Sequence, residues 1–450
     1  MNVDFVTEYH DLLVSGDPLA EWEQFKAGME AHNLRFKERY VCNVLRPFLL
    51  PRARYDEVVR ATDAFFGAIR TLYGWLMEDA ALRARVGLTE VEEAALHVDP
   101  GFPSPDGIGR LDGFLDPQGT LRFVEYNADS PGGLAFGPAL GDLFMALPTM
   151  RRFAERHAVQ PPHSIADIQA TLLNHYRVWG GTEERPSIGI VDWQGLGTAP
   201  EFVLCQEHFE RAGYPTIITH PAALALRGGT LWDEESGWPL HIVYKRVLVG
   251  ELLEQLGLEN VLTDAIRQHA ACVVNSYRAQ LLFKKALFAL LSEMADDARF
   301  PARQREAIHR HLPWTRLLVE GRVTYEGRDV EMLSLLLDGQ ERFALKPNSE
   351  YGGKGVVLGW EIPATEWQQA LNDALQSGQP HVVQERIMVA SEPFPLVRDG
   401  SLVIEPRFMD LDPYTFGVET VRGAGVRLGA SGLLNVTAGS GSAVPLVLVG

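Results

Sequence analysis

Apolar residues recur at helical spacing through the first 97 residues of the chain, most clearly over 55–87. Apolar positions three and four apart form one continuous stripe on a helix. We therefore expect the first 97 residues to be helical. Prolines and glycines between 100 and 107 then predict a loop.

Two short runs of alternating apolar and polar residues follow, at 109–116 and 121–129. A period of two is typical of a half-buried strand, and Pro117-Gln118-Gly119 supplies turn residues between the runs. The two runs are therefore predicted to pair as a β-hairpin. The loop Pro131-Gly132-Gly133 leads from it into a helix predicted near 138–156.

Residues 187–275 alternate between strand and helix patterns, which is typical of an α/β unit with a largely parallel sheet. The glycines after the first strand lack the G-x-G-x-x-G spacing, which argues against a dinucleotide fold. The predicted strands are 187–193, 215–219 and 241–247, and the predicted helices are 201–213 and 262–270.

The last third of the chain has helices before strands, so the chain is predicted to be α+β at both ends with an α/β subdomain between them. The predicted helices lie near 279–295 and 301–311, and the predicted strands are 342–347, 355–360, 381–387 and 401–411.

Charge and composition exclude several classes of partner. The chain has 450 residues and a formal net charge of −18, which argues against a nucleic-acid partner because such binders need a basic surface. No apolar run approaches the roughly 20 residues that cross a bilayer. Cys42, Cys205 and Cys272 form no C-x-x-C pair, and the N-terminus lacks a secretory signal pattern. We expect a cytoplasmic protein with no membrane partner.

A lysine at the end of a predicted strand precedes a glycine-rich loop, KPNSEYGGKG at 346–355. The strand delivers Lys346, and Gly352 and Gly353 let the backbone approach a ligand closely. Adjacent backbone N–H groups hold phosphate oxygens, and a lysine adds positive charge. This segment indicates a phosphate site. The alternative is a glycine-rich hairpin with a solvated lysine.

Polar side chains alternate along both strands of the predicted hairpin. Residues two apart on a strand face the same side, so Glu125 and Asn127 present oxygens to one spot, and Arg110 and Asp112 share a side of the partner strand. Hard oxygen ligands suit Mg²⁺, which shares phosphate oxygens with a nucleotide. The alternative is a hairpin with one solvated polar face.

Three further pairs are candidates for ligand contacts. Lys284-Lys285 interrupts an apolar helix, where adjacent lysines usually lie at the exposed polar edge, although one could reach a phosphate. Lys245-Arg246 ends a strand, where α/β sheets place ligands. Gln384-Glu385 ends another strand, whose backbone could read an adenine edge; the alternative is an ordinary edge strand.

These segments together resemble one group of enzymes. The loop at 346–355 resembles the glycine-rich loop of eukaryotic glutathione synthase, and EYNADSPGGL at 125–134 is similar to that family and to bacterial glutathionylspermidine synthase. The segment 274–291 looks like the family segment with a nucleotide-binding lysine, and VYKR at 243–246 resembles its basic strand. Both families are circularly permuted ATP-grasp ligases, and the order of motifs here matches that permutation.

The resemblance implies roles for the matching residues. ATP would contact Lys285, Lys346, Glu350, Gly352, Gly353, Lys354, Gln384 and Glu385. Mg²⁺ would be held by Asp112, Glu125, Asn127 and Glu350. The substrate would face Arg110, Ser130, Lys245 and Arg246, with Arg110 and Lys346 as the catalytic residues. The loop departs from the family at Tyr351, where the family has glycine, and at Lys354, where it has asparagine.

The resemblance also implies an ATP-grasp fold in four parts. These are a helical N-terminal region at 1–107, a first ATP-grasp part with the metal-binding hairpin at 108–180, an α/β substrate-side subdomain at 181–276, and a nucleotide-binding part at 277–450.

The implied function is an ATP-dependent carboxylate–amine ligase, similar to glutathionylspermidine synthase. A small-molecule carboxylate or short peptide would be phosphorylated by ATP to an acyl phosphate, and an amine acceptor would then form the amide. Two alternatives remain open: an ATP-dependent phosphotransferase on the same fold, and a catalytically silent ATP-grasp-like binding protein.

Overall fold

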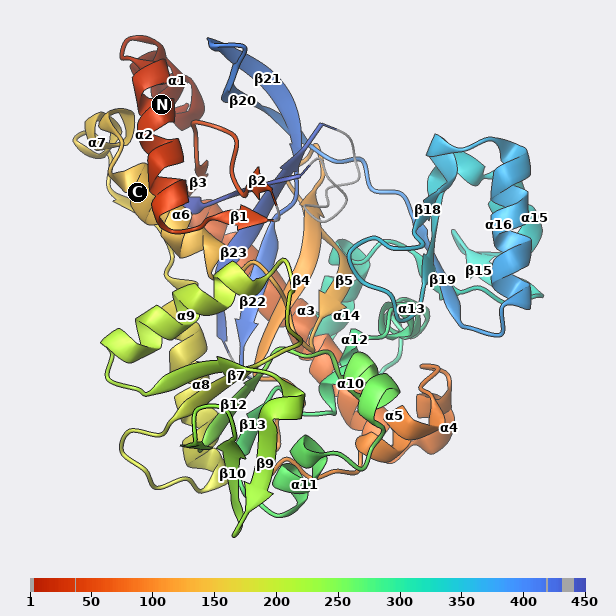
Figure 1. The fold of residues 1–450 in the computed structure, drawn as a ribbon. Helices are drawn as coiled ribbons and strands as arrows, with labels where there is room; N and C mark the ends of the chain where they lie inside the picture. Colours follow the sequence, from red (N-terminus) through yellow and green to blue (C-terminus); the bar gives the residue numbers. More distant parts are fainter. Residues whose placement is uncertain (1–3, 37, 418–419, 431–440) are drawn as a thin grey trace.

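The computed structural model describes residues 4–36, 38–417, 420–430 and 441–450 of the chain. Helices and strands are mixed throughout these residues, and the strands form several separate sheets (Figure 1). This agrees with the predicted α+β pattern around an α/β unit. No helix in the described part of the chain has both the length and the apolar character needed to span a bilayer.

The largest sheet joins the predicted hairpin to strands from the last part of the chain (Figure 1). In the described residues its order is β20-β21-β23-β22-β4-β5, with β24 paired to β23, and neighbouring strands run antiparallel. Its strands are β4 (Ile108–Leu115), β5 (Leu121–Asn127), β20 (Ser391–Arg398), β21 (Ser401–Met409), β22 (Asp412–Phe416), β23 (Thr420–Gly429) and β24 (Ser442–Val444).

A bulge in the hairpin separates its apolar residues from its polar ones. The register pairs Asp112 with Glu125 and Gly113 with Phe123, so Val124 has no partner opposite it. An extra residue in one strand reverses the alternation of faces beyond it. Phe123 therefore packs on helix α3 (Arg52–Glu78), while Glu125 lies on the cavity side of the strand.

The α/β unit contains the predicted parallel sheet, with strand order β13-β12-β7-β8. After β7 the chain adds β8 on one side of it and then β12 on the other, so the strand order reverses at β7. In parallel sheets, ligands bind at the carboxyl ends of the strands next to such a reversal. The elements are α8 (Ser164–Trp179), β7 (Ile188–Val191), α9 (Ala199–Arg211), β8 (Thr216–Thr219), η1 (Pro221–Ala223), β9 (Leu224–Arg227), β10 (Thr230–Asp233), β11 (Trp238–Leu240), β12 (Ile242–Lys245), α10 (Val249–Leu256), α11 (Val261–Arg267) and β13 (Cys272–Val274).

A smaller lobe lies at the right in Figure 1. It has its own apolar core around Trp367. Its sheet has the order β14-β19-β17-β18. Helix α14 (Ala302–His311) comes before the lobe and packs on α3. The elements of the lobe are β14 (Thr315–Leu317), β15 (Arg322–Tyr325), β16 (Arg328–Glu331), α15 (Met332–Asp338), η2 (Gln340–Arg342), β17 (Phe343–Pro347), β18 (Val357–Leu358), η3 (Gly359–Glu361), α16 (Ala364–Gln376) and β19 (His381–Glu385).

The prediction that the N-terminal region is wholly helical is wrong, because the region also contains strands. The apolar run at 48–51 forms β3, which pairs in parallel with β25 near the C-terminus. A short apolar run fits a strand or a helix equally, and its partner lies at the far end of the chain. The elements of the N-terminal region are α1 (Phe5–Val14), α2 (Pro18–Ala31), β1 (Arg35–Phe36), β2 (Arg39–Tyr40), β3 (Phe48–Pro51), α4 (Ala80–Ala84) and α5 (Glu90–Ala95). The sheet that β3 joins also contains β25 (Leu446–Val449) and β6 (Val159–Gln160).

Two predicted helices are each divided in two. The helix predicted near 138–156 is α6 (Phe136–Met145) and α7 (Pro148–Ala154), because Pro148 cannot donate the backbone bond that a continuous helix needs. The helix predicted near 279–295 is α12 (Ala279–Phe283) and α13 (Ala286–Glu293), with Lys284 in an extended conformation between them.

Candidate functional site

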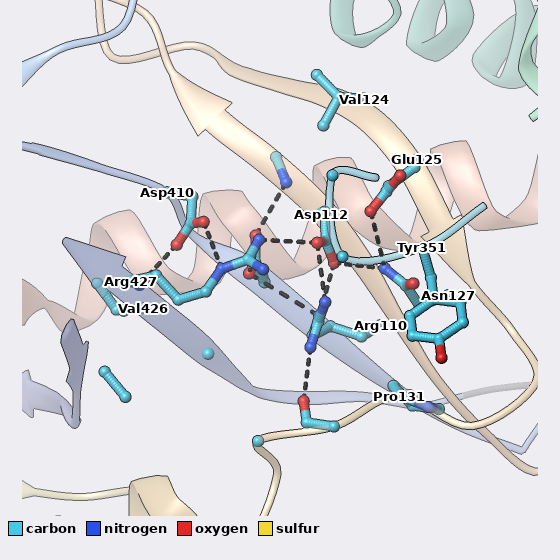
Figure 2. A pocket seen from close by; sticks show the side chains of 18 of the residues that line it. Arg110, Asp112, Val124, Glu125, Asn127, Pro131, Tyr351, Asp410, Val426 and Arg427 are labelled. Carbon is cyan, nitrogen blue, oxygen red and sulfur yellow. Dashed lines mark hydrogen bonds and ion pairs between the residues drawn. The ribbon is translucent and has the colours of Figure 1, made fainter. Parts of the chain in front are cut away.

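A cavity of about 570 Å³ has walls from the largest sheet, the α/β unit and the smaller lobe. Figure 2 shows the part around the hairpin. Among the described residues, Lys245, Lys285, Glu350 and Lys354 are predicted site residues that do not line it. The predicted residues that do line it are Arg110, Asp112, Glu125, Asn127, Ser130, Arg246, Lys346, Gly352, Gly353, Gln384 and Glu385.

The hairpin brings its predicted metal ligands together on one face. Asn127 lies opposite Arg110 in the register, and Asp112 lies opposite Glu125. The Asn127 amide donates from Nδ2 to Asp112 Oδ1 at 2.9 Å and to Glu125 Oε1 at 3.5 Å. These two bonds fix the amide, and Figure 2 shows its oxygen on the side away from both carboxylates.

Two arginines bracket the Asp112 carboxylate (Figure 2). Arg110 donates from Nε to Oδ1 at 2.6 Å and from Nη2 to Oδ2 at 2.9 Å. Arg427 of β23 donates from Nη2 to Asp112 Oδ2 at 2.7 Å and from Nε to Asp410 Oδ2 at 2.6 Å. Its Nη2 also lies 2.9 Å from Asp412 Oδ2. The result is a buried network of alternating charges in the cavity wall.

Arg427, Asp410 and Asp412 were not predicted from the sequence. The one local signal is Asp410-Leu411-Asp412, which has the same two-residue spacing of polar groups as Arg110 and Asp112. That spacing acquires meaning only when β22 pairs with β4, which joins segments far apart in the sequence.

Burial and the arginines give neighbouring carboxyl groups different pKa values. Burial raises the pKa of Asp410 to about 6, although Arg427 opposes it. Burial acts in the same direction on Asp112, but the Arg110 and Arg427 guanidiniums outweigh it and leave the pKa at about 2. Asp112 is therefore charged at neutral pH and holds both arginines in place.

Two lysines act on Glu125 from the opposite side. Lys285 Nζ lies 3.3 Å from Glu125 Oε2, and Lys346 donates from Nζ to Gln384 Oε1 at 2.6 Å. Burial lowers the pKa of Lys346 to about 8; Glu125 opposes this shift, and Lys285 adds to it. Two ammonium groups near one partly exposed carboxylate form a setting that favours a phosphate group.

Lys284 and Lys285 are both buried, so the interpretation of this pair as an exposed polar edge is wrong. Lys284 donates from Nζ to Glu92 Oε1 at 2.8 Å and to Ser349 Oγ at 2.7 Å. Lys285 instead donates to the backbone carbonyl oxygen of Glu350. The break between α12 and α13 thus sends one lysine to the base of the glycine-rich loop and the other toward Glu125.

The glycine-rich loop lies along the cavity and contacts its other wall. Gly352 and Gly353 have φ values of 65° and 75°, which favour glycine. The Tyr351 hydroxyl donates to Glu251 Oε1 of α10 at 2.8 Å. Burial and this hydrogen bond raise the pKa of Tyr351 to about 12. The tyrosine that distinguishes this loop from the resembling families therefore joins it to the α/β unit.

Glu350 and Lys354 pair with each other instead of facing the cavity. Their side chains are 3.2 Å apart, and that of Lys354 is 76% exposed. In this arrangement neither side chain belongs to the described lining of the cavity. The two residues were predicted to contact phosphate or metal, and that assignment stays a prediction.

The two basic residues at the end of β12 have different surroundings. Lys245 is fully buried, forms an ion pair with fully buried Asp129, and donates to the Val247 carbonyl oxygen at 2.9 Å. These contacts fix Lys245 inside the protein, away from the cavity lining. Ser130, predicted on the substrate side, donates its hydroxyl to the Lys245 carbonyl oxygen at 3.3 Å.

Arg246 lines the cavity although its side chain is buried. It donates from Nη1 to the Tyr244 hydroxyl at 3.2 Å and lies 3.9 Å from Glu201 Oε2. Its Nε has no hydrogen-bond partner among the residues that the structure describes. The guanidinium therefore adds a buried positive charge to the cavity wall, which favours an anion in the cavity.

Gln384 and Glu385 do not lie on an edge strand, because β19 pairs with β14 on one side and β17 on the other. The Glu385 N–H donates to the Trp314 carbonyl at 2.8 Å. The Arg386 N–H donates to the Arg342 carbonyl oxygen at 2.7 Å. The backbone N–H groups of Glu385 and Arg386 are therefore occupied, and the next residue, Ile387, also lines the cavity.

No protein family matches the sequence of this chain, and no curated protein sequence matches it. The structure is similar to that of a glutathione synthetase-like effector from Globodera pallida in its apo form, with a TM-score of 0.58 and 14% sequence identity. The match covers 96% of this chain and 94% of that one. This structural similarity shows that the two proteins share a fold.

Proposed function

We propose that this protein is an ATP-dependent carboxylate–amine ligase with a circularly permuted ATP-grasp fold. One observation carries the proposal: the hairpin with Glu125 and Asn127 and the strand with Lys346 come from different halves of the chain and line one cavity. Acidic oxygen ligands and lysines then lie together, as the binding of a metal–nucleotide complex requires.

The nucleotide site would lie between the hairpin and the smaller lobe. Lys346 and Lys285 supply positive charge for the phosphates, and Gly352 and Gly353 let the loop backbone approach them. Apolar surface for a base is available on the same wall, where Val124, Ala344, Leu358 and Ile387 line the cavity.

The hairpin residues fit a magnesium ion that is shared with phosphate groups. Among the described residues, no group of three or more His, Cys, Asp or Glu side chains is placed to hold a metal alone. Mg²⁺ usually keeps waters and takes one or two carboxylates plus phosphate oxygens. Glu125 would hold the ion, which would offset negative charge on the phosphates. Asp112 is bound by Arg110 and Arg427, and the Asn127 oxygen lies on the side away from both carboxylates, so the metal contacts of these two residues stay predictions.

The proposed reaction has two steps. A substrate carboxylate oxygen attacks the γ-phosphorus of ATP, forming an acyl phosphate as ADP leaves. A neutral amine then attacks the acyl carbon, loses a proton and displaces inorganic phosphate, which leaves an amide. The protein contributes position and charge: Lys346 and Arg110 face the transferred group, and Arg246 with Ser130 faces the acceptor side.

Arg110 is held in place for this role. Asp112 binds its guanidinium through two hydrogen bonds, and its Nη1 donates to the Gly132 carbonyl oxygen at 2.5 Å. A guanidinium fixed by a carboxylate needs little reorganisation as charge develops next to it. The network of Arg427 with Asp410 would stabilise the same arrangement from behind.

The test is a screen for ADP release over pairs of carboxylates and amines with ATP and Mg²⁺, followed by mass spectrometry of the products. An amide product with one ADP per turnover supports the ligase. A phosphorylated acceptor without an amide would instead establish a phosphotransferase. If calorimetry detects no binding of ATP with Mg²⁺, the protein is a silent relative and the proposal is wrong.

A further inference from the structure

The glycine-rich loop at 346–355 connects two walls of the cavity. Tyr351, Gly352 and Gly353 line the cavity on the side of the smaller lobe, and Glu251 of α10 lines it on the side of the α/β unit. The Tyr351 hydroxyl donates to Glu251 Oε1 at 2.8 Å. This hydrogen bond is therefore a contact between the loop and the other wall of the cavity.

The start of the loop is also attached to the body of the protein. Lys284 donates from Nζ to Ser349 Oγ at 2.7 Å, and Lys285 donates to the carbonyl oxygen of Glu350. Both lysines are buried, so they hold the loop from inside the protein. The hydrogen bond of Tyr351 adds a further contact at the point where the chain enters the two glycines.

The part of the loop beyond Tyr351 has little rigidity of its own. Gly352, Gly353 and Gly355 have φ values of 65°, 75° and 70°. Glycine has the largest backbone freedom of any residue, so this stretch has much entropy to lose when it adopts one conformation. The Tyr351 side chain is 49% exposed, and a hydrogen bond that water can reach is easily broken. Removal of this one bond should therefore change how often the loop leaves its position.

The loop in this position still leaves space for a ligand. The cavity that it lines has a volume of about 570 Å³, which lies within the range of small-molecule sites. A ligand can therefore bind while the bond between Tyr351 and Glu251 is intact. A loop that is already in place does not have to be ordered at the moment of binding, and this strengthens binding.

We propose that Tyr351 and Glu251 form a latch that holds the glycine-rich loop over the cavity before a nucleotide binds. This inference rests on the proposed ligase function, in which Gly352 and Gly353 approach the phosphates. Tyr351 is then a positioning residue, because it acts through the loop backbone and not by touching the nucleotide. The resembling families have glycine at this position, so the latch is a feature of this chain and is not implied by the resemblance.

Lys354 gives a direct measure of the latch, because its side chain is 76% exposed and trypsin cleaves after lysine. Tyr351→Phe removes the hydroxyl and keeps the ring. The loop should then open more often, and the bond between Lys354 and Gly355 should be cleaved at least about threefold faster. Mass spectrometry of the released peptides follows this one bond. Equal cleavage of Tyr351→Phe and of the unmodified protein would overturn the proposal.

The matched control is Tyr40→Phe. The Tyr40 hydroxyl also donates to a glutamate, Glu30, but this pair lies in the N-terminal region outside the cavity lining. We expect trypsin to cleave this variant after Lys354 at the rate of the unmodified protein. Faster cleavage in the control as well would show that the loop responds to any lost tyrosine bond, and the latch would be refuted.

The second measurement is the binding, by calorimetry, of AMP and of the non-hydrolysable β,γ-imido analogue of ATP with Mg²⁺. In the proposed site the loop approaches the terminal phosphates, which AMP lacks. Tyr351→Phe should weaken binding of the analogue at least about threefold and leave the binding of AMP unchanged. If both nucleotides bind more weakly by the same factor, the tyrosine supports the site as a whole, and the positioning role is wrong.

A double-mutant cycle separates the latch from a direct contact between Tyr351 and the nucleotide. If Tyr351 acts through Glu251, then adding Tyr351→Phe to Glu251→Ala should cause no further loss of affinity for the ATP analogue. If the two substitutions instead have independent effects that add, the tyrosine does not act through Glu251, and the latch is refuted.

The latch and the ligase function can fail separately. If the ATP analogue does not bind to the unmodified protein, the proposed function fails, and the cleavage rates alone decide whether the latch holds the loop. If the analogue binds and an amide is formed, while Tyr351→Phe changes neither cleavage nor affinity, the ligase stands and the latch proposal fails.

Discussion

Lys285 Nζ lies 3.3 Å from Glu125 Oε2, which joins α13 to the second strand of the hairpin. Against the effect of burial, Lys285 and Lys346 lower the pKa of Glu125, so this carboxyl is charged at neutral pH. A charged carboxylate on the cavity wall, held by a lysine behind it, is the central feature of the proposed magnesium and phosphate site.

Glu125→Gln should raise the Mg²⁺ concentration needed for half-maximal ADP release by at least tenfold, because the amide removes the negative charge that attracts the ion. The comparison variant is Glu23→Gln. The Glu23 side chain is 69% exposed and lies outside the cavity lining, so we expect its midpoint to stay unchanged. Identical Mg²⁺ titrations of Glu125→Gln and the unmodified protein would contradict the metal role.

Lys346→Ala should lower the rate of ADP release by roughly 10²-fold or more, since it removes a positive charge that faces the transferred phosphate. Lys26→Ala removes a lysine outside the cavity lining and should have little effect. Both proteins should keep the circular dichroism spectrum of the unmodified chain. Turnover of Lys346→Ala at the normal rate would remove this lysine from the proposed site.

The local parts of the site were predictable from sequence, and the long-range parts were not. The alternation that places Glu125 and Asn127 on one face, and the strand that delivers Lys346, depend on neighbours in the chain. Arg427 and Asp410 enter the site through the pairing of distant strands, which no local pattern encodes. The bulge at Val124 likewise depends on the partner strand.

Burial was the property that sequence patterns judged least well. Lys284 lies in an apolar segment and was expected to be exposed, because a buried lysine is costly without a partner. The partner is Glu92, from a helix distant in sequence.

Lys284→Met should destabilise the protein by about 3 kcal/mol, because it leaves the buried Glu92 carboxylate without its cation. The measurement is the midpoint of urea unfolding. Lys26→Met breaks an ion pair with Glu23 whose glutamate is 69% exposed, and should change stability by less than about 1 kcal/mol. A Lys284 variant as stable as the Lys26 variant would show that the buried pair contributes little.

Asp106 is a buried carboxyl that accepts a hydrogen bond from the Tyr126 hydroxyl behind the hairpin. Burial raises its pKa to about 6, although the tyrosine opposes the shift. The folded protein therefore retains this proton over a pH range where the unfolded chain, with an ordinary aspartate pKa of about 3.9, has lost it. Stability contributed by the neutral form is complete below about pH 4 and is lost as pH rises to about 6.

Asp106→Asn replaces this group with a neutral side chain whose oxygen can still accept from Tyr126. Relative to the unmodified protein, the variant should gain up to about 3 kcal/mol between pH 4 and pH 7, because about two pKa units of linkage disappear. Urea titrations at several pH values measure the difference. Asp297→Asn is the control: Asp297 has a pKa of about 2, so it stays ionised across this range and the difference should be constant. A constant difference for Asp106→Asn as well would mean that Asp106 is already ionised in the folded protein at pH 4.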